Sequence, residues 1–261
     1  MSDEINRNSP ESVNVLGVHL RTVTIHDIIS YIIRSIDENQ KAIIAYANVH
    51  AVNLSLELPW FRDFLNQSAL TYCDGFGVKW GAKLLGHSLP QRFTPPDWFP
   101  QLADTCAQKG LSFFFLGARP GVADKCSESL RERFPKLKVV GTHHGYFDKT
   151  PACEATEEVI KLINSAQPDI LVVGFGMPAQ ERWLLENWER INAYIALPVG
   201  AMFDYLTGEV PRAPRWMTEH GLEWLGRLVI EPRRLWKRYI IGNPRFFWFV
   251  IQQRLGIFQT H

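Results

Sequence analysis

In the first hundred residues, short apolar runs typical of buried strands alternate with longer segments of helical period. Strands are expected at 13–20, 42–47 and 70–73, and helices at 24–38 and 49–65. Thr24 and Asp27 have the spacing of a capping box, with Asp in place of the usual Glu, which favours a helix start at this point. The strand that ends at Cys73 is followed directly by Asp74 and Gly75, so a carboxylate is expected at the carboxyl end of a strand.

The second half of the chain repeats an apolar run, a glycine-containing turn and a helix. The apolar runs predict strands at 112–116, 138–141, 169–173 and 194–198. Uninterrupted apolar strands that alternate with helices indicate an α/β fold, with a parallel sheet covered by helices on both faces. Ligands of such folds bind beyond the carboxyl ends of the strands, which is also where the glycine turns are expected.

After about residue 212 the sequence becomes helical in pattern, rich in tryptophan and basic. From Arg227 onward there are seven Lys and Arg residues and one acid, Glu231, although the whole chain has a net charge of only +1. Aromatic residues interleaved with basic ones suit an anionic membrane surface. Three segments are therefore predicted: a disordered leader at 1–12, a core at 13–211, and a basic, aromatic helical appendage at 212–261 that associates with a membrane.

Composition narrows the function classes and the location. A net charge of +1 gives no overall field to attract nucleic acid. The four cysteines are widely separated, without the spacing of a zinc site or a disulfide scaffold, so reduced thiols in the cytoplasm are expected. We find neither a signal peptide nor an apolar run long enough to span a bilayer, so the protein is expected to lie peripherally on the inner face of the plasma membrane. Exposed tryptophans such as Trp216 leave a homo-oligomer open.

Asp74 and Asn48 are the first candidates for chemistry, because each follows a predicted strand at the same edge of the sheet. Asp74 could deprotonate an acceptor hydroxyl, and the amide of Asn48 could hold a sugar substituent. Both residue types also commonly cap the helix that follows a strand, and the local pattern leaves that alternative open.

The most distinctive string is Gly-Phe-Gly-Met-Pro-Ala-Gln-Glu at 174–181. Glycines after a strand allow a phosphate to approach, Pro178 suits a helix start, and Gln180 is expected in the first turn, facing the ligand. The string differs from a dinucleotide-binding fingerprint, and no acid ends a strand about 20 residues later, so a nicotinamide enzyme is disfavoured. His143 and His144 have no evident third ligand, so no metal site is predicted. The nearby Tyr146 could stack on a nucleobase or simply pack.

Several arginines of the appendage lie on one predicted helix. Arg234 and Arg238 are four residues apart and share a face, with Arg233 and Arg227 close in sequence. They form either a solvated basic face or a clamp for a diphosphate, to which the planar guanidinium is suited. Arg92 follows a predicted helix and alone indicates little.

Together these strings resemble the WecG/TagA/CpsF glycosyltransferases, over about residues 13–239. The resemblance is carried by Asn48, the segments 74–78, 91–92, 115–117, 141, 144–147, 174–181, 200–204, 212–214, 221–224 and 231–234, all in one order. It implies a Rossmann-like core and an inverting transferase of bacterial surface polysaccharide or teichoic acid synthesis. The implied donor is a UDP-sugar, N-acetylmannosamine or its uronate, used as substrate without a cofactor or catalytic metal. The implied acceptor is a sugar linked to polyprenyl diphosphate.

The resemblance also assigns roles to residues. Asp74 matches the general base, Asn48, Arg92 and Gln180 match active-site residues, and the basic appendage matches a segment that reaches the membrane and completes the site around the diphosphate. We expect nucleotide-sugar contacts at the following residues of the strand-end turns: Gly117, Gly145, Tyr146, Gly174, Gly176, Gln180, Glu181, Gly200 and Asp204. Arg227, Arg233, Arg234 and Arg238 are assigned to the diphosphate and the membrane.

Two departures from the family bear on the sugar. Tyr46 stands where many members have Thr, and the segment after Arg92 reads Phe-Thr-Pro-Pro-Asp, without the Gly that many members have before its Asp. Another donor such as UDP-glucose therefore stays open. So does a non-catalytic subunit of a membrane assembly that binds nucleotide-sugars, although the presence of Asp74, Asn48 and Gln180 argues against it.

Overall fold

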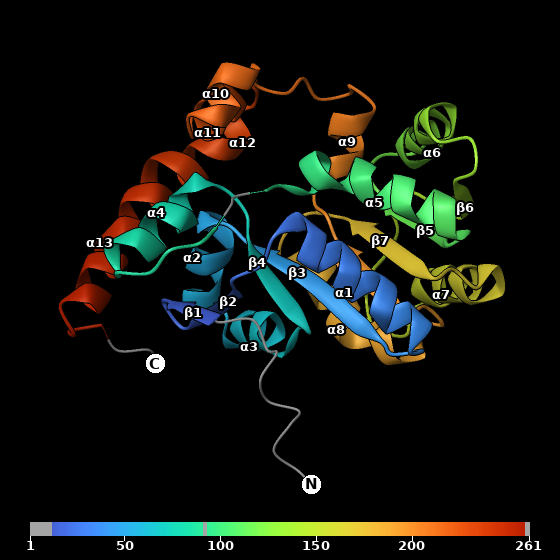
Figure 1. The fold of residues 1–261 in the computed structure, drawn as a ribbon, viewed down its shortest axis with the longest axis horizontal. Coiled ribbons are helices and arrows are strands. Elements are labelled where there is room, and N and C mark those ends of the chain that lie inside the picture. Colours follow the sequence, from blue (N-terminus) through green and yellow to red (C-terminus); the bar gives the residue numbers. More distant parts are fainter. Residues whose placement is uncertain (1–11, 91–92, 259–261) are drawn as a thin grey trace, which may run out of the picture.

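The computed structural model describes residues 12–90 and 93–258, which form a six-stranded parallel sheet covered by helices. Its strand order is β4-β3-β8-β7-β5-β6 (Figure 1). The strands are β3 (Ala42–Ala47), β4 (Leu70–Cys73), β5 (Ser112–Gly117), β6 (Lys138–His143), β7 (Ile170–Gly174) and β8 (Ile195–Pro198). Each lies within two residues of its predicted bounds. The predicted α/β, Rossmann-like fold with a parallel sheet is thus confirmed.

Two hydrophobic clusters lie on opposite faces of the sheet, because successive strand residues point to opposite sides. One cluster is covered by α1 (Ile25–Asp37), α5 (Pro95–Lys109), α6 (Val122–Arg133) and α9 (Met202–Leu206). The other is covered by α2 (Val49–Glu57), α3 (Pro59–Gln67), α4 (Phe76–Leu84), α7 (Glu154–Ala166), α8 (Ala179–Asn187) and a 3₁₀ turn at Trp188–Arg190. The predicted capping box of Thr24 and Asp27 is present at the start of α1.

Two local predictions were wrong. The segment 13–20 is not one strand but an antiparallel hairpin of β1 (Ser12–Val15) and β2 (Val18–Arg21), which turns at Leu16 and Gly17, both with positive φ. The segment 49–65 contains two helices, because Pro59 has no backbone N–H to continue the first and begins the second. The predicted disordered leader, apart from Ser12 in β1, lies outside the described residues.

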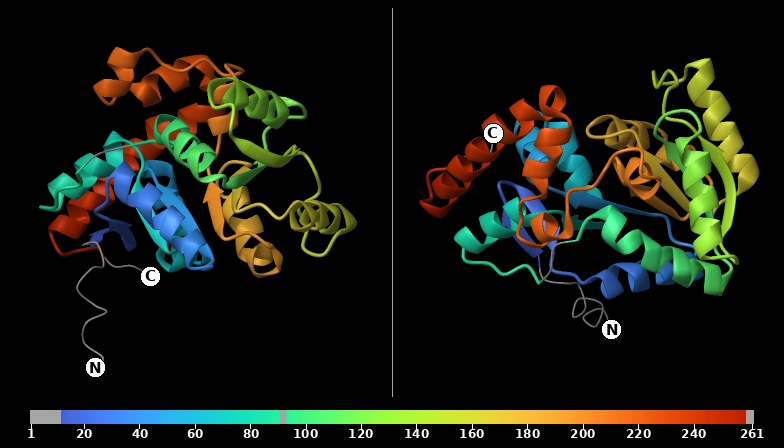
Figure 2. Two further views of the ribbon diagram at one scale, coloured as in Figure 1. Left: turned by 45° about the vertical axis from the view of Figure 1, so that its right-hand side comes forward. Right: turned by 90° about the horizontal axis from the view of Figure 1, so that it is seen from above.

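The chain after residue 212 forms a row of helices beside the core (Figure 2). They are α10 (Arg215–Glu219), α11 (Glu223–Ile230), α12 (Pro232–Trp236), a π-helical turn (Lys237–Ile241) and α13 (Gly242–Arg254). The last helix packs on α2 and α4, and its Phe246 and Val250 are fully buried in the core cluster on that side. A Cβ atom at Gly81 of α4 would lie 2.6 Å from the Phe246 ring, so this contact needs a residue without a side chain.

An ion pair also ties the appendage to the core. The Arg212 guanidinium lies 2.6 Å from the Asp97 carboxylate at the start of α5 and 3.6 Å from Glu223 at the start of α11. It also donates to Thr94, which caps α5. The appendage is thus fixed against the carboxyl edge of the sheet at both of its ends.

Candidate active site

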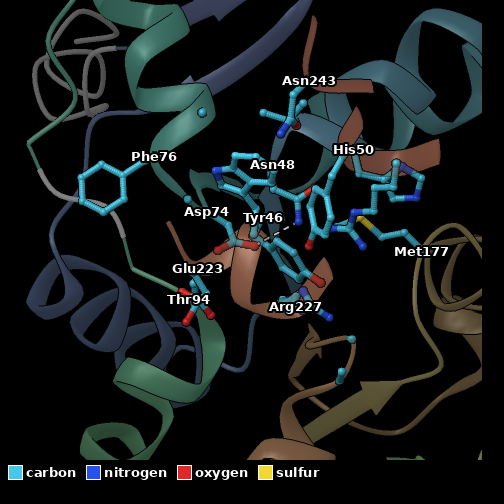
Figure 3. Close-up of a pocket in the computed structure, with 18 of the residues that line it drawn as sticks. Tyr46, Asn48, His50, Asp74, Phe76, Thr94, Met177, Glu223, Arg227 and Asn243 are labelled. Carbon is cyan, nitrogen blue, oxygen red and sulfur yellow. Dashed lines mark hydrogen bonds between the residues drawn. The ribbon is translucent and has the colours of Figure 1, made fainter. Parts of the chain in front are cut away.

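A pocket of about 600 Å³ lies between the carboxyl ends of β3, β4 and β8 and the helices of the appendage. Figure 3 shows Tyr46, Asn48 and Asp74 together in it, with Arg227 and Glu223 contributed by the appendage. Much of the pocket lining is apolar and comes from α2, α4, α11, the π-helical turn and α13. Its apolar lining residues include Val49, Phe76, Trp80, Trp224, Ile240, Pro244 and Phe247.

Asn48 and Asp74 meet at the edge of the sheet, as predicted. Ala47 and Cys73 are paired in the β3–β4 register, so the residues that follow them lie side by side. The Asn48 Nδ2 donates to Asp74 Oδ2 at 3.1 Å, while its Oδ1 accepts from the backbone N–H of Ala51. Asn48 is therefore both a helix cap and a partner of the carboxylate. The cap of α4 is Gly75 and has no side-chain hydrogen bond, so Asp74 is not used as a cap.

Three of the four predicted arginines line the pocket. Arg227 and Arg238 each have a buried Nε without a hydrogen-bond partner, and Arg234 reaches the pocket while pairing with Glu231 at 2.8 Å. Burial, together with the positive charge of Arg227, lowers the pKa of Arg238 from its usual value. Arg233 is exposed and is not among the lining residues. The pocket thus holds three guanidiniums and the carboxylates of Asp74 and Glu223, and the buried Nε donors of Arg227 and Arg238 are suited to an anion.

Polar lining residues that the sequence did not assign to binding include His50, Thr94, Glu223 and Asn243. Tyr46, which the family resemblance placed near the sugar, also lines the pocket. Burial, and secondarily the positive charge of Arg238, lower the pKa of His50 to about 3, so its imidazole is neutral at physiological pH. His50 lies two residues after Asn48 in the first turn of α2, which brings it to the same edge. The helix start predicted at residue 49 was the signal that could have found it.

The glycine turns have two different functions in the structure. Gly176, with φ of +82°, and Gly200 line the pocket and leave room for a ligand. Gly174 does not line the pocket, and a Cβ atom there would lie 2.8 Å from the Gly200 carbonyl oxygen. Gly117 is paired with Gly174 in the sheet, and a Cβ atom at Gly117 would likewise be too close to the Gly174 backbone. Gly117 and Gly174 therefore allow the strand ends to approach one another.

Gln180 lies in the first turn of α8, as predicted, but its side chain is fully buried and does not line the pocket. Its Oε1 accepts from the N–H groups of Gly176 at 3.2 Å and Gly200 at 3.0 Å, and its Nε2 donates to Glu181 at 2.7 Å. The Gln180 amide therefore does not face a ligand directly, as was expected. Instead it holds together the two turns that line the pocket. Burial raises the pKa of Glu181 to about 7, and its Oε2 has no hydrogen-bond partner.

The remaining predicted contacts lie outside the pocket lining. Gly145 donates its N–H to Ala118 beyond the ends of β5 and β6, and Tyr146 beside it is 69% exposed. Asp204 of α9 is partly buried, and burial raises the pKa of its carboxyl group. Arg92 lies outside the described residues, so its predicted role stays a prediction.

Neither a metal-binding cluster nor a membrane-spanning helix is formed by the described residues. Within residues 12–90 and 93–258, no three His, Cys, Asp or Glu side chains are grouped to hold a metal ion. Over the same part of the chain, every helix is too short or too polar to cross a bilayer.

Comparison with known proteins gives one family. A family model described as "Glycosyl transferase WecG/TagA/CpsF family" matches residues 13–259. Curated relatives named N-acetylglucosaminyldiphosphoundecaprenol N-acetyl-beta-D-mannosaminyltransferase occur in Bacillus spizizenii, Bacillus subtilis and Staphylococcus aureus, with 29%, 28% and 26% identity. The matches cover 87%, 90% and 89% of this chain and 85%, 93% and 88% of the relatives.

Proposed function

The chain belongs to the WecG/TagA/CpsF family of glycosyltransferases, and we propose that it transfers N-acetylmannosamine, or its uronate, from a UDP-sugar to a polyprenyl-diphosphate-linked sugar. The names of the three relatives describe an N-acetylmannosaminyl transfer to such a lipid-linked sugar, and the matches span most of both chains. The product would enter bacterial surface polysaccharide or teichoic acid synthesis.

The observation that carries the proposal is that a carboxylate from the strand ends and guanidiniums from the appendage line the same pocket. Asp74 is held by Asn48 at the strand ends, and Arg227 and Arg238 come from the appendage with unused N–H groups at buried Nε atoms. Buried guanidiniums without partners are costly unless an anion completes them. A diphosphate supplies that charge and accepts the hydrogen bonds, which makes this pocket suited to UDP or to a lipid diphosphate.

The proposed reaction is a single displacement. The acceptor hydroxyl oxygen attacks the anomeric carbon, its proton passes to the Asp74 carboxylate, and the bond between that carbon and the UDP phosphate oxygen breaks. Attack from the side opposite the leaving group inverts the anomeric configuration. The negative charge that develops on UDP at the Gly176 turn is stabilised by Arg227, Arg234 and Arg238, so we expect no catalytic metal.

The remainder of the nucleotide is proposed to run along the strand ends. From Gly176 and Gly200 the edge continues toward Gly117, Gly145 and Tyr146, which lie at the ends of β5 and β6. Tyr146 has a largely exposed ring on which the base can stack.

The role of Asp74 is tested by Asp74→Asn, which keeps the size of the side chain. Loss of a positioned base costs about 100- to 10,000-fold in rate, and we expect a loss in that range with a lipid-linked acceptor. Glu223→Gln is the matched variant, because Glu223 is the other carboxylate in the pocket. If the transfer rate falls by this factor in Glu223→Gln and not in Asp74→Asn, the base is Glu223. Competition binding with a panel of UDP-sugars, UDP-glucose included, tests the donor.

We also propose that the appendage side of the molecule lies on an anionic membrane surface, at the cytoplasmic face. Among the described residues, thirteen of the seventeen exposed large hydrophobic side chains belong to α4 or to the chain after residue 212. Exposed basic residues stand among them, namely Lys83, Arg233, Lys237 and Arg254. Apolar rings and cations together suit the interface of an anionic bilayer, and the neighbouring pocket would then open close to its lipid-linked acceptor.

Sedimentation with vesicles tests this surface. We expect binding to anionic vesicles that weakens as salt rises, since exposed charges are screened beyond about 8 Å at physiological ionic strength. Trp248→Ser, on α13, should weaken binding, whereas Leu162→Ser, an exposed apolar residue of α7, should not. Equal binding of the wild type to neutral vesicles would contradict the electrostatic part, and equal loss in both variants would contradict the surface.

A further inference from the structure

Tyr46, the next-to-last residue of β3, has its phenol at the bottom of the pocket. Its side chain is only 6% exposed, and its ring lies 6.1 Å from that of Tyr72 on the neighbouring strand. Tyr72 is in turn stacked on Phe93 and accepts a hydrogen bond from Trp98. The aromatic cluster therefore holds the Tyr46 ring in one place.

The hydroxyl of Tyr46 lies at the Gly200 turn. A Cβ atom built at Gly200 would be 2.8 Å from the phenol oxygen. Figure 3 shows Tyr46 beside Asp74 in the pocket. Asp74 is close enough for its negative charge to act on the phenol. The phenol thus lies near both the candidate base and one of the turns that line the pocket.

The Gln180 amide behind this turn is engaged elsewhere. Its Oε1 accepts the N–H groups of Gly176 and Gly200, and its Nε2 donates to Glu181. The Tyr46 hydroxyl has one hydrogen of its own that it can donate into the pocket.

The phenol keeps this hydrogen at physiological pH. Burial first, and then the negative charges of Asp74 and Glu181, raise the pKa of Tyr46 well above its usual value. The group is accordingly a neutral hydrogen-bond donor.

We propose that Tyr46 donates a hydrogen bond to an oxygen substituent of the transferred sugar. This rests on the proposed function, in which the acceptor hydroxyl is at Asp74 and the diphosphate leaves near Gly176 and Gly200, so that the transferred sugar lies between them. A group that is close to both Asp74 and the Gly200 turn meets the sugar. A neutral phenol is suited to a hydroxyl or an acetamido carbonyl oxygen, neither of which carries charge.

The test is the affinity that the sugar adds to the nucleotide. Kd is measured by calorimetry for UDP and for UDP-N-acetylmannosamine, with the wild type and with Tyr46→Phe, which keeps the ring and removes the hydroxyl. One neutral hydrogen bond corresponds to about 3- to 10-fold. We expect Tyr46→Phe to bind the UDP-sugar about 3- to 10-fold more weakly and to bind UDP as the wild type does.

Tyr72→Phe is the matched control, because it removes a phenol hydroxyl from the same aromatic cluster outside the pocket lining. Unchanged UDP-sugar affinity in Tyr46→Phe overturns the inference, and so does an equal loss for UDP, which would move the contact to the nucleotide. An equal loss of UDP-sugar affinity in Tyr72→Phe would also overturn it, because the loss would then come from altered packing of the aromatic cluster. Because binding is measured without turnover, a wild type that binds UDP-sugar and transfers nothing contradicts the proposed function alone.

Discussion

Replacement of Arg238 by Met is expected to make the free protein more stable and its nucleotide binding weaker. The Arg238 side chain is half-buried in the pocket lining, its Nε is buried without a hydrogen-bond partner, and the positive Arg227 lies close enough to act on it. Removing a buried charge that is not paired, while keeping the length of the side chain, relieves its desolvation cost and the repulsion between the two guanidiniums. We expect a gain of about 1 to 3 kcal/mol in the free energy of unfolding without ligand.

The same substitution removes a charged donor from the diphosphate. Hydrogen bonds to charged groups are worth about 1.5 to 3 kcal/mol, which corresponds to roughly 10- to 150-fold in the Kd for UDP. Calorimetric titration with UDP and thermal unfolding without ligand measure the two effects. Arg233→Met is the control, since Arg233 is exposed on α12 and does not line the pocket. Unchanged UDP affinity in Arg238→Met, or an equal loss in Arg233→Met, would refute the reasoning.

Three further variants test other parts of the structure. Glu181→Gln keeps an oxygen that accepts from the amide of Gln180 but cannot ionise. Because burial raises the pKa of Glu181 from 4.5 to about 7, the free energy of unfolding of the wild type should fall relative to that of this variant by roughly 3 kcal/mol between pH 4.5 and 7. Urea unfolding across this pH range measures the difference. Gly81→Val should push the fully buried Phe246 ring away from α4 and lower stability by about 1 to 3 kcal/mol; an unchanged urea midpoint would contradict this packing. Arg212→Met removes the ion pairs that join α5 and α11, so limited trypsin digestion should cut the appendage faster than in the wild type, and an equal rate would show that these pairs do not hold it.

The strands and the meeting of Asn48 and Asp74 could be predicted because both depend on local pattern. Buried parallel strands are continuous apolar runs, and the carboxyl ends of parallel strands share one edge. The β3–β4 register then brings the residues after Ala47 and Cys73 together. The failure at Pro59 was local too, since proline interrupts a helical pattern that otherwise continues.

Other features depend on contacts between distant segments and could not be read from the sequence. Gln180 was expected to face a ligand, yet its amide is used by two turns, one of them 20 residues later. Tyr46 has the pattern of a core aromatic in a strand, and only the position of the Gly200 turn shows that its hydroxyl reaches the pocket. The spacing of Arg234 and Arg238 predicted a shared face, but which partner that face meets is decided by the packing of α13 on α2 and α4.

The central claim is that Asp74 and the arginines of the appendage form one site for sugar transfer. It is tested most directly by incubating the purified protein with a panel of UDP-sugars and a polyprenyl-diphosphate-linked N-acetylglucosamine acceptor, followed by mass spectrometry of the lipid. We expect the acceptor to gain one N-acetylhexosamine with the wild type, and this product to form about 100- to 10,000-fold more slowly with Asp74→Asn. Binding of UDP-sugar without any gain in acceptor mass, or product formed equally fast by Asp74→Asn, would contradict the claim.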